Sequence, residues 1–302
     1  MATTGWRMRV IVDVHTHTPR WRDAVPASVG RAVETKWSPG QARPLVYTWD
    51  EYLAELQPVD RAICFNIACD PRQPELVNEP YVVPTPNVND ETAAFVHADP
   101  DKFIGFLSVH PHDPNAVTEM ERATTDLGLR GLKLGANYQN FDPLGEEAFR
   151  LYRYAEDHAL PMMVHQGTSP VRFADLDHAH PRHIDRIATA FPDLTIIMAH
   201  IGHPWQTDCI AVVRKHPRVW ADISGSVLRP WGHYQAMAAA LEWGVLDKLL
   251  FASDFPASTP TETMAKLRQV NAVAEGTALP RIPEATIEAI ITRDSLSLLG
   301  LS

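Results

Sequence analysis

The chain has 302 residues, at the upper end for a single domain, and its 45% hydrophobic and 21% charged residues are ordinary for a globular protein. Its net charge of −10 argues against a nucleic-acid partner, because phosphate binding needs a clustered basic surface. Three cysteines without a CxxC pair give no disulfide framework, and no apolar run approaches the roughly 18 residues of a membrane span, so we expect a cytoplasmic protein.

Short apolar runs rich in β-branched residues recur along the chain, with helical patterns between them. Nearly continuous apolar content in such runs is typical of strands buried on both faces, and therefore parallel. The predicted strands are residues 8–14, 61–67, 103–109, 131–134, 161–165, 195–200, 219–223 and 249–252. The predicted helices are residues 89–98, 116–126, 146–158, 182–190, 206–215, 235–243, 259–279 and 284–299.

Repeated alternation of strand and helix specifies a parallel α/β fold. An open doubly wound sheet would carry a glycine-rich turn after its first strand, but this chain has HTHTPRW there. We therefore predict a (β/α)8 TIM barrel that forms one domain over residues 1–302. Residues 18–57 lack strong periodicity and are rich in Trp, Pro and Arg, which indicates a long first βα loop that caps the barrel mouth or packs on a neighbouring subunit.

Side chains that bind metals stand at the ends of four of these predicted strands. His15 and His17 end the first, His165 the fifth and His200 the sixth, and Asp254 follows the eighth. Parallel strands closed into a barrel bring such side chains to one mouth, where barrel enzymes keep their chemistry. This pattern predicts a metal-dependent enzyme.

The individual residues indicate different roles. The HxH spacing of His15 and His17 puts both imidazoles on one face of a strand, as two ligands of one ion require. Three histidines and Asp254 suit zinc, iron or manganese. His200 is either a further ligand or a general acid or base. Lys133 is a carbamylated bridge between two metals, an anion contact, or a neutral buried amine.

The segments DVHTH, GLKLG, MMVHQGTS, IIMAHIGHP and LLFASDFP together resemble the amidohydrolase-related family, which includes aminocarboxymuconate-semialdehyde decarboxylase. The resemblance covers the barrel from about residue 9 to the end. It implies one ion, most simply zinc, held by His15, His17, His165 and Asp254, with His200 as the acid or base. Many decarboxylases of the family lack the strand-four lysine, whereas in two-metal hydrolases of the wider superfamily that lysine is the carbamylated bridge.

The sequence therefore supports a metal-dependent hydrolase acting on a small carboxylate, amide, ester or lactone through metal-activated water, with His200 and Asp254 moving protons. A non-oxidative decarboxylase of an aromatic or unsaturated acid is the alternative. Oxygen chemistry on iron is a third enzymatic reading. An inactive barrel that serves as the structural partner of an active paralogue is the non-enzymatic one. We expect a homodimer with one ion per chain, or two if Lys133 bridges.

Four further side chains in the βα loops are candidates for substrate binding. Arg172 and Arg229 follow strands five and seven, where an arginine can hold a carboxylate, and Tyr138 and Trp205 can wall a pocket. Asp222 and Ser224 follow strand seven, and hydrogen bonding within the barrel is the default for them. The histidine-rich DLDHAHPRH leads into a helix and is not expected to bind metal, and VHPHD after strand three is expected to be a solvated loop.

Overall fold

The computed structural model describes residues 10–36, 45–73, 87–169 and 171–302. Two predictions fall partly outside these residues, namely the start of the first strand at residues 8 and 9 and part of the 18–57 loop. Parallel strands occupy all eight predicted positions: β1 Val12–His17, β2 Arg61–Phe65, β3 Phe103–Gly105, β4 Leu132–Leu134, β5 Met162–Val164, β6 Ile196–Met198, β7 Val219–Asp222 and β8 Leu249–Leu250.

The strands form two parallel sheets, β1-β2-β3 and β4-β5-β6-β7-β8, which are joined at both edges. A parallel bridge from Leu107 to Leu132 connects β3 with β4, and a bridge from Thr16 to Phe255 connects β1 with the segment after β8. The backbone N–H of Lys133 also donates to the Leu107 carbonyl at 2.7 Å. These contacts close the sheets into the (β/α)8 barrel that the sequence predicts.

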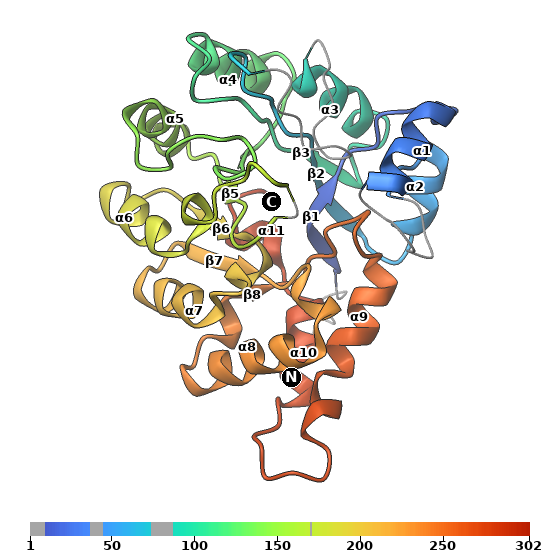
Figure 1. Cartoon of the computed structure of the whole chain (residues 1–302), viewed down its shortest axis with the longest axis vertical. Coiled ribbons are helices and arrows are strands. Elements are labelled where there is room, and N and C mark those ends of the chain that lie inside the picture. Colours follow the sequence, from blue (N-terminus) through green and yellow to red (C-terminus); the bar gives the residue numbers. More distant parts are fainter. Residues whose placement is uncertain (1–9, 37–44, 74–86, 170) are drawn as a thin grey trace, which may run out of the picture.

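Helices surround the strands, which gather at the centre of the molecule (Figure 1). The α-helices are α1 Ala27–Lys36, α2 Trp49–Glu55, α3 Val88–Val96, α4 Ala116–Thr125, α5 Glu146–Asp157, α6 Arg182–Ala190, α7 Gln206–Lys215, α8 Pro230–Glu242, α9 Pro260–Arg268, α10 Glu284–Ile291 and α11 Ser295–Leu298. Each amphipathic helix turns its apolar stripe to the strands: α6, for example, buries Ile184, Ile187 and Ala188. Within the described residues, every helix is too short or too polar to traverse a lipid bilayer.

Two of these helices lie in the segment that the sequence analysis assigns to a loop. Helix α2 begins with a capping box, in which the Thr48 side chain accepts from the Glu51 N–H and the Glu51 carboxylate accepts from the Thr48 N–H. This Thr-x-x-Glu signature is readable in the sequence and overrides the weak periodicity. The last two predicted helices are each interrupted: α9 continues as the 3-10 helix η5 (Val270–Ala274), and α10 and α11 are separate.

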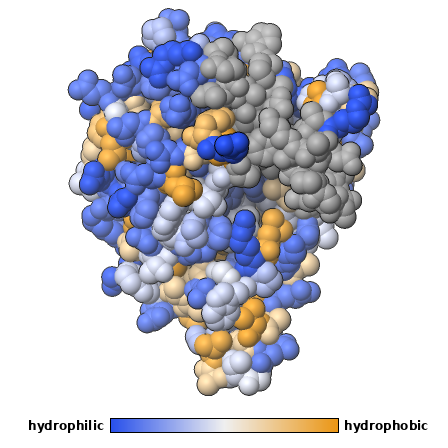
Figure 2. All heavy atoms as spheres, viewed as in Figure 1, coloured by the Kyte–Doolittle hydropathy of each residue, from blue (hydrophilic) through white to orange (hydrophobic). Residues whose placement is uncertain are grey.

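Apolar side chains fill two layers. An outer cluster lies between strands and helices, and an inner one lies inside the barrel, with Val12, Val14, Ile63, Phe65 and Leu250 among its members. On the face seen in Figure 2, hydrophilic side chains predominate and hydrophobic ones form small separate patches. The polar side chains of the barrel mouth pack on this inner cluster.

Candidate active site

A β-bulge aims the first two histidines into the barrel. Asp13 pairs with Ala62 and Thr16 with Cys64, so three residue steps of β1 oppose two of β2. Such a bulge shifts the alternation of side chains along a strand by one. As a result Val14 and the two histidines all face the interior, although strict alternation would put Val14 on the opposite side. Val14 belongs to the inner cluster, and the rings of His15 and His17 lie 5.1 and 5.0 Å from that of Phe65.

Asp254 joins this pair from the segment after β8. Its Oδ1 lies 3.2 Å from Nε2 of His15 and 3.2 Å from Nε2 of His17. Its backbone has a φ of 58°, and its N–H donates to the His15 carbonyl at 2.9 Å. Non-glycine residues at positive φ cost roughly 1 kcal/mol or more and cluster at functional sites. The strained turn therefore serves to bring the carboxylate back over β1.

His165 and His200 meet on the other side of the mouth. His165 Nδ1 lies 3.2 Å from His200 Nε2, and the His200 ring is 5.0 Å from that of His15. Nε2 of His165 is buried and has no hydrogen-bond partner among the described residues. Ligand atoms of His15, His200 and Asp254 lie within 4.8 Å of one another. A buried ring nitrogen without a partner is costly, so its lone pair is suited to an ion.

Lys133 comes from the middle of β4 and is fully buried. Its Nζ lies 4.6 Å from the centroid of the Phe65 ring and has no hydrogen-bond partner among the described residues. Burial lowers the pKa of Lys133 to about 8, although the carboxylates of Asp222 and Asp254 oppose the shift. The amine is thus partly neutral in weakly alkaline solution.

Asp222 and Ser224, which end β7 and begin the following loop, were expected only to form hydrogen bonds within the barrel, but they contact two histidines of the site. Asp222 Oδ2 lies 2.9 Å from Nδ1 of His15. Ser224 Oγ lies 2.5 Å from the other oxygen, Oδ1, and 2.9 Å from Nδ1 of His200. Both side chains are fully buried. Their place at the end of a barrel strand was the signal that could have found them.

The carboxyl groups of the site are ionised and most of its imidazoles are neutral. Burial opposes ionisation of Asp254, but the positive charge of His15 and the hydrogen bonds from His15 and His17 hold the pKa of Asp254 well below its usual range. Burial lowers the pKa of His17 and that of His200 to about 4, and it holds the pKa of His165 well below its usual range. Neutral imidazoles and ionised carboxylates are the forms that coordinate metals.

The four predicted substrate-binding residues lie in different surroundings. The Tyr138 ring packs against His165, with centroids 4.8 Å apart, and covers Gly135, where a Cβ would lie 2.1 Å from the tyrosine Cζ. Trp205 instead packs on His180 at 4.9 Å. Arg172 and Arg229 are exposed. Among the described residues, Tyr138 is the one of the four whose ring packs against a histidine of the cluster. A substrate-binding role for all four stays a prediction.

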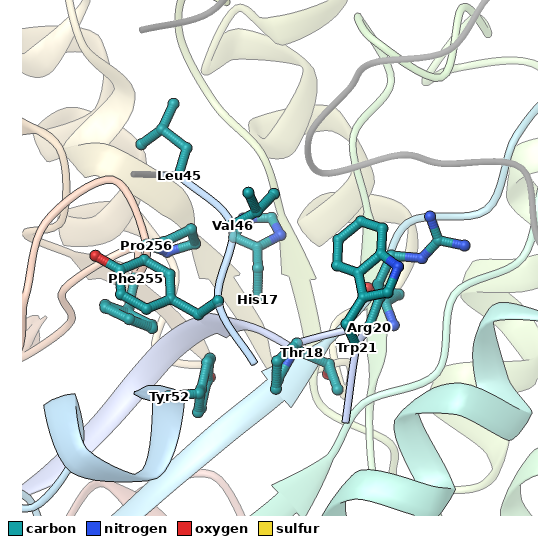
Figure 3. A pocket seen from close by; sticks show the side chains of 12 residues that line it. His17, Thr18, Arg20, Trp21, Leu45, Val46, Tyr52, Phe255 and Pro256 are labelled. Atoms are coloured by element: carbon teal, nitrogen blue, oxygen red, sulfur yellow. The ribbon is translucent and has the colours of Figure 1, made fainter. Parts of the chain in front are cut away.

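A cavity opens beside His17, and it is lined mainly by aromatic and aliphatic side chains. Phe255 and Pro256 lie on one side of His17 and Arg20 and Trp21 on the other, and Leu45 and Val46 also line the cavity (Figure 3). Tyr47, Tyr52 and Asn66 complete the lining with Thr18 and Pro19. Described parts of the 18–57 segment therefore contribute to a pocket next to the predicted ligands.

A second cluster, Asp70, His110 and His112, has ligand atoms within 4.8 Å of one another but is already hydrogen bonded. His110 Nε2 bonds the Gln139 carbonyl at 2.6 Å, and its Nδ1 accepts the His112 N–H at 3.1 Å. His112 Nδ1 and Arg72 both contact the Asp70 carboxylate. With the lone pair of His110 used and a guanidinium adjacent, this cluster ties loops together. The expected solvated loop at His110 is thus buried.

The fold and this donor set define a class: a (β/α)8 barrel with imidazole and carboxylate groups gathered at the carboxyl ends of its strands. A family model for amidohydrolases matches residues 12–291, so the chain belongs to the amidohydrolase family.

Solved structures with the same fold include 5-carboxyvanillate decarboxylase from Sphingomonas paucimobilis, with 17% identity over 97% of this chain and 100% of that one, and a TM-score of 0.63. A dihydroxybenzoic acid decarboxylase from Polaromonas, with bound manganese and 2-nitroresorcinol, has 16% identity over 97% and 98% of the two chains and a TM-score of 0.64. A protein from Acinetobacter baumannii assigned to 2-pyrone-4,6-dicarboxylic acid hydrolysis, with citric acid bound, has 14% identity over 96% and 99%, and a TM-score of 0.60.

Proposed function

We propose that this amidohydrolase-family protein is a metal-dependent hydrolase of a small carboxylate, amide, ester or lactone. The observation that carries the proposal is Lys133, a fully buried amine whose Nζ has no hydrogen-bond partner among the described residues. A buried amine without a partner is destabilising unless something else in the site uses it. A carbamate bridge or a substrate anion would do so.

The residues fit a divalent ion. Ligands at about 2.0–2.2 Å from a tetrahedral zinc lie roughly 3.3 Å from one another. Asp254 Oδ1 is 3.2 Å from a nitrogen of His15 and from a nitrogen of His17, and the unpartnered Nε2 of His165 is buried. We assign the ion to His15, His17, His165 and Asp254, with zinc preferred and iron or manganese as alternatives.

A bound divalent ion would lower the pKa of a water to about 7 and polarise the carbonyl that this water attacks. His200 and Asp254 would then move the protons: His200 would take one proton of the attacking water, and the Asp254 carboxylate would take the other and pass it to the leaving group. Tyr138, packed on His165, would wall the site, and Arg172 and Arg229 would meet the substrate's carboxylate from the rim of the mouth.

Lys133 distinguishes between one ion and two. Its neutral amine can attack carbon dioxide, forming an N–C bond and releasing a proton, and the resulting carbamate has oxygen donors for a second ion. The lowered pKa of Lys133, about 8, supports this step because it increases the neutral fraction of the amine. Left unmodified, its ammonium group would instead hold a substrate anion.

Non-oxidative decarboxylation is the second candidate. It is favoured by the apolar and aromatic side chains that line the cavity beside His17, and by the decarboxylases among the structures of similar fold. In that reaction the bond from the ring carbon to its carboxylate breaks, carbon dioxide leaves, and His200 delivers a proton to the carbon.

Metal and carbamate analysis of the purified protein tests these alternatives. Two ions per chain, and a carbamate signal from carbon-13 bicarbonate in NMR that Lys133→Ala abolishes, are the results expected of the hydrolase. One ion without that signal, together with carbon dioxide release from a panel of hydroxybenzoates, would favour the decarboxylase. Protein that retains no stoichiometric metal, and that turns over neither the hydroxybenzoates nor a panel of esters, amides and lactones, would point to the inactive structural partner. Light scattering tests the expected homodimer.

A further inference from the structure

We propose that Asp222 and Ser224 form a positioning pair that fixes the tautomers of His15 and His200 together. Its catalytic consequence rests on the proposed function, because it is felt through a metal ligand and an acid–base group. The pair itself is a matter of hydrogen-bond direction in the protein alone. The buried Asp222 carboxylate bonds the ring of His15 on β1 directly, and it contacts the ring of His200, just after β6, through the Ser224 hydroxyl.

The contact to His15 is direct. An ionised carboxylate only accepts hydrogen bonds, so the 2.9 Å contact between Asp222 Oδ2 and His15 Nδ1 requires the proton on Nδ1. In the metal-free protein Nε2 of His15 also carries a proton, which it directs at Asp254 Oδ1, 3.2 Å away. With Nδ1 held by Asp222, Nε2 is the nitrogen that would lose its proton to bind an ion. A carboxylate behind an imidazole in this way also orients the ring and strengthens its donor nitrogen.

The contact to His200 passes through Ser224. The hydroxyl has a single proton, and Asp222 Oδ1, at 2.5 Å, can only accept it. The Ser224 oxygen must therefore accept from His200 Nδ1–H at 2.9 Å. The lone pair of His200 is then on Nε2, the nitrogen that lies 3.2 Å from His165.

The backbone around the pair holds it in place. Asp222 Oδ1 also accepts the N–H groups of His200 and Ser224, at 3.0 and 2.9 Å. Gly225 follows at a φ of 64°, and a Cβ there would lie 3.2 Å from Nδ1 of His200. A side chain at this position would be strained by the positive φ and would crowd the imidazole, so glycine favours the contact between His200 and Ser224.

The two members of the pair have separable effects. Ser224→Ala removes only the link to His200, and we expect kcat to fall 10- to 100-fold, with KM and bound metal unchanged. Asp222→Asn disturbs His15 as well, and we expect bound metal to fall along with kcat. Ser224→Thr keeps the hydroxyl and should restore most of the kcat that Ser224→Ala loses.

Ser226 provides the matched control. It lies in the same loop and is equally buried, and its hydroxyl donates to the Ile223 carbonyl at 2.6 Å and contacts Nδ1 of His233 at 3.0 Å. Ser226→Ala therefore removes a buried serine hydroxyl that bonds a histidine outside the site. We expect it to leave kcat within about twofold of the wild-type value.

Nitrogen-15 NMR of histidine-labelled, metal-free protein reads the tautomers directly, with the His200 signals assigned by their loss in His200→Asn. Protonated Nδ1 at His15 and His200 in the wild type, and a shift toward protonated Nε2 at His200 in Ser224→Ala, are the expected results. Protonated Nε2 at His200 in the wild type would overturn the proposal without requiring any variant to fold, and so would full kcat in Ser224→Ala. Correct tautomers in a protein that neither binds metal nor hydrolyses a substrate would leave the positioning pair intact and reject the proposed function.

Discussion

The Nζ of Lys133 lies 4.6 Å above the ring of Phe65, deep in a barrel that gives it no hydrogen-bond partner among the described residues. The aromatic face offers a weak attraction to a cation but does not replace water. Lys133 is thus retained at a cost to stability, and the cost depends on pH.

That dependence can be measured against Lys133→Met, which fills a similar volume. Burial lowers the pKa of Lys133 from 10.5 to about 8, which corresponds to roughly 3 kcal/mol. Below pH 8 the folded state bears the full penalty, and above about 10.5 it bears none. Urea unfolding of the metal-free proteins, without carbon dioxide, measures this effect. The free energy of unfolding of the wild type should rise relative to that of Lys133→Met between pH 8 and 10.5. A constant difference would mean that the amine is not desolvated.

His17→Ala should remove most of the bound metal, because it deletes one of the two imidazole nitrogens 3.2 Å from Asp254 Oδ1. Elemental analysis after purification with added zinc measures the loss. His178→Ala is the control, since His178 belongs to the histidine-rich segment that leads into α6. Equal metal in both variants would contradict the assignment of His17 as a ligand.

His110→Ala should weaken the fold and spare the metal. The His110 side chain is 2% exposed, so its removal leaves a buried cavity and breaks the hydrogen bond to the Gln139 carbonyl. We expect the free energy of unfolding to fall by about 2–5 kcal/mol. Chemical unfolding and metal content, measured on the same preparation, decide the matter. Loss of one equivalent of metal would show that the second cluster binds an ion after all.

Thr48→Ala should cost about 1 kcal/mol, the usual value of an N-cap, because it ends the capping box of α2. Thermal unfolding measures the change. Thr125→Ala is a useful comparison, since its hydroxyl bonds the Glu121 carbonyl inside α4 and caps nothing. Equal effects of the two substitutions would argue that the box adds no stability.

His200→Asn should lower kcat by about 10²-fold or more, as for any positioned acid or base, while the protein stays folded. The backbone of His200 has a φ of 59°, a conformation that asparagine tolerates better than most residues. Steady-state kinetics with a metal assay provide the measurement. Near-full turnover with normal metal would assign the proton transfer to another group.

The sequence was sufficient to predict the barrel and the approach of the five side chains at its strand ends, because apolar runs mark the strands and a barrel brings their carboxyl ends together. The site details depend on backbone features that the residues do not reveal. The β1 bulge aims His15 and His17, and the positive φ of Asp254 turns its carboxylate back over β1.

Other misses have different physical causes. Asp222 and Ser224 looked like ordinary polar residues of a barrel, since only the structure shows that a single carboxylate reaches histidines on two other segments. His110 seemed solvated because a polar VHPHD segment reads as surface. Gln139, from a different loop, covers it.

The predicted ligands lie at opposite ends of the chain: β1 supplies His15 and His17, and Asp254 follows β8. During synthesis, Asp254 therefore leaves the ribosome only after most of the barrel, long after His15 and His17. Metal binding by these predicted ligands would be a late event in folding, since it would need the final strand to dock beside the first. A bound ion would then hold the first and last strands of the barrel together.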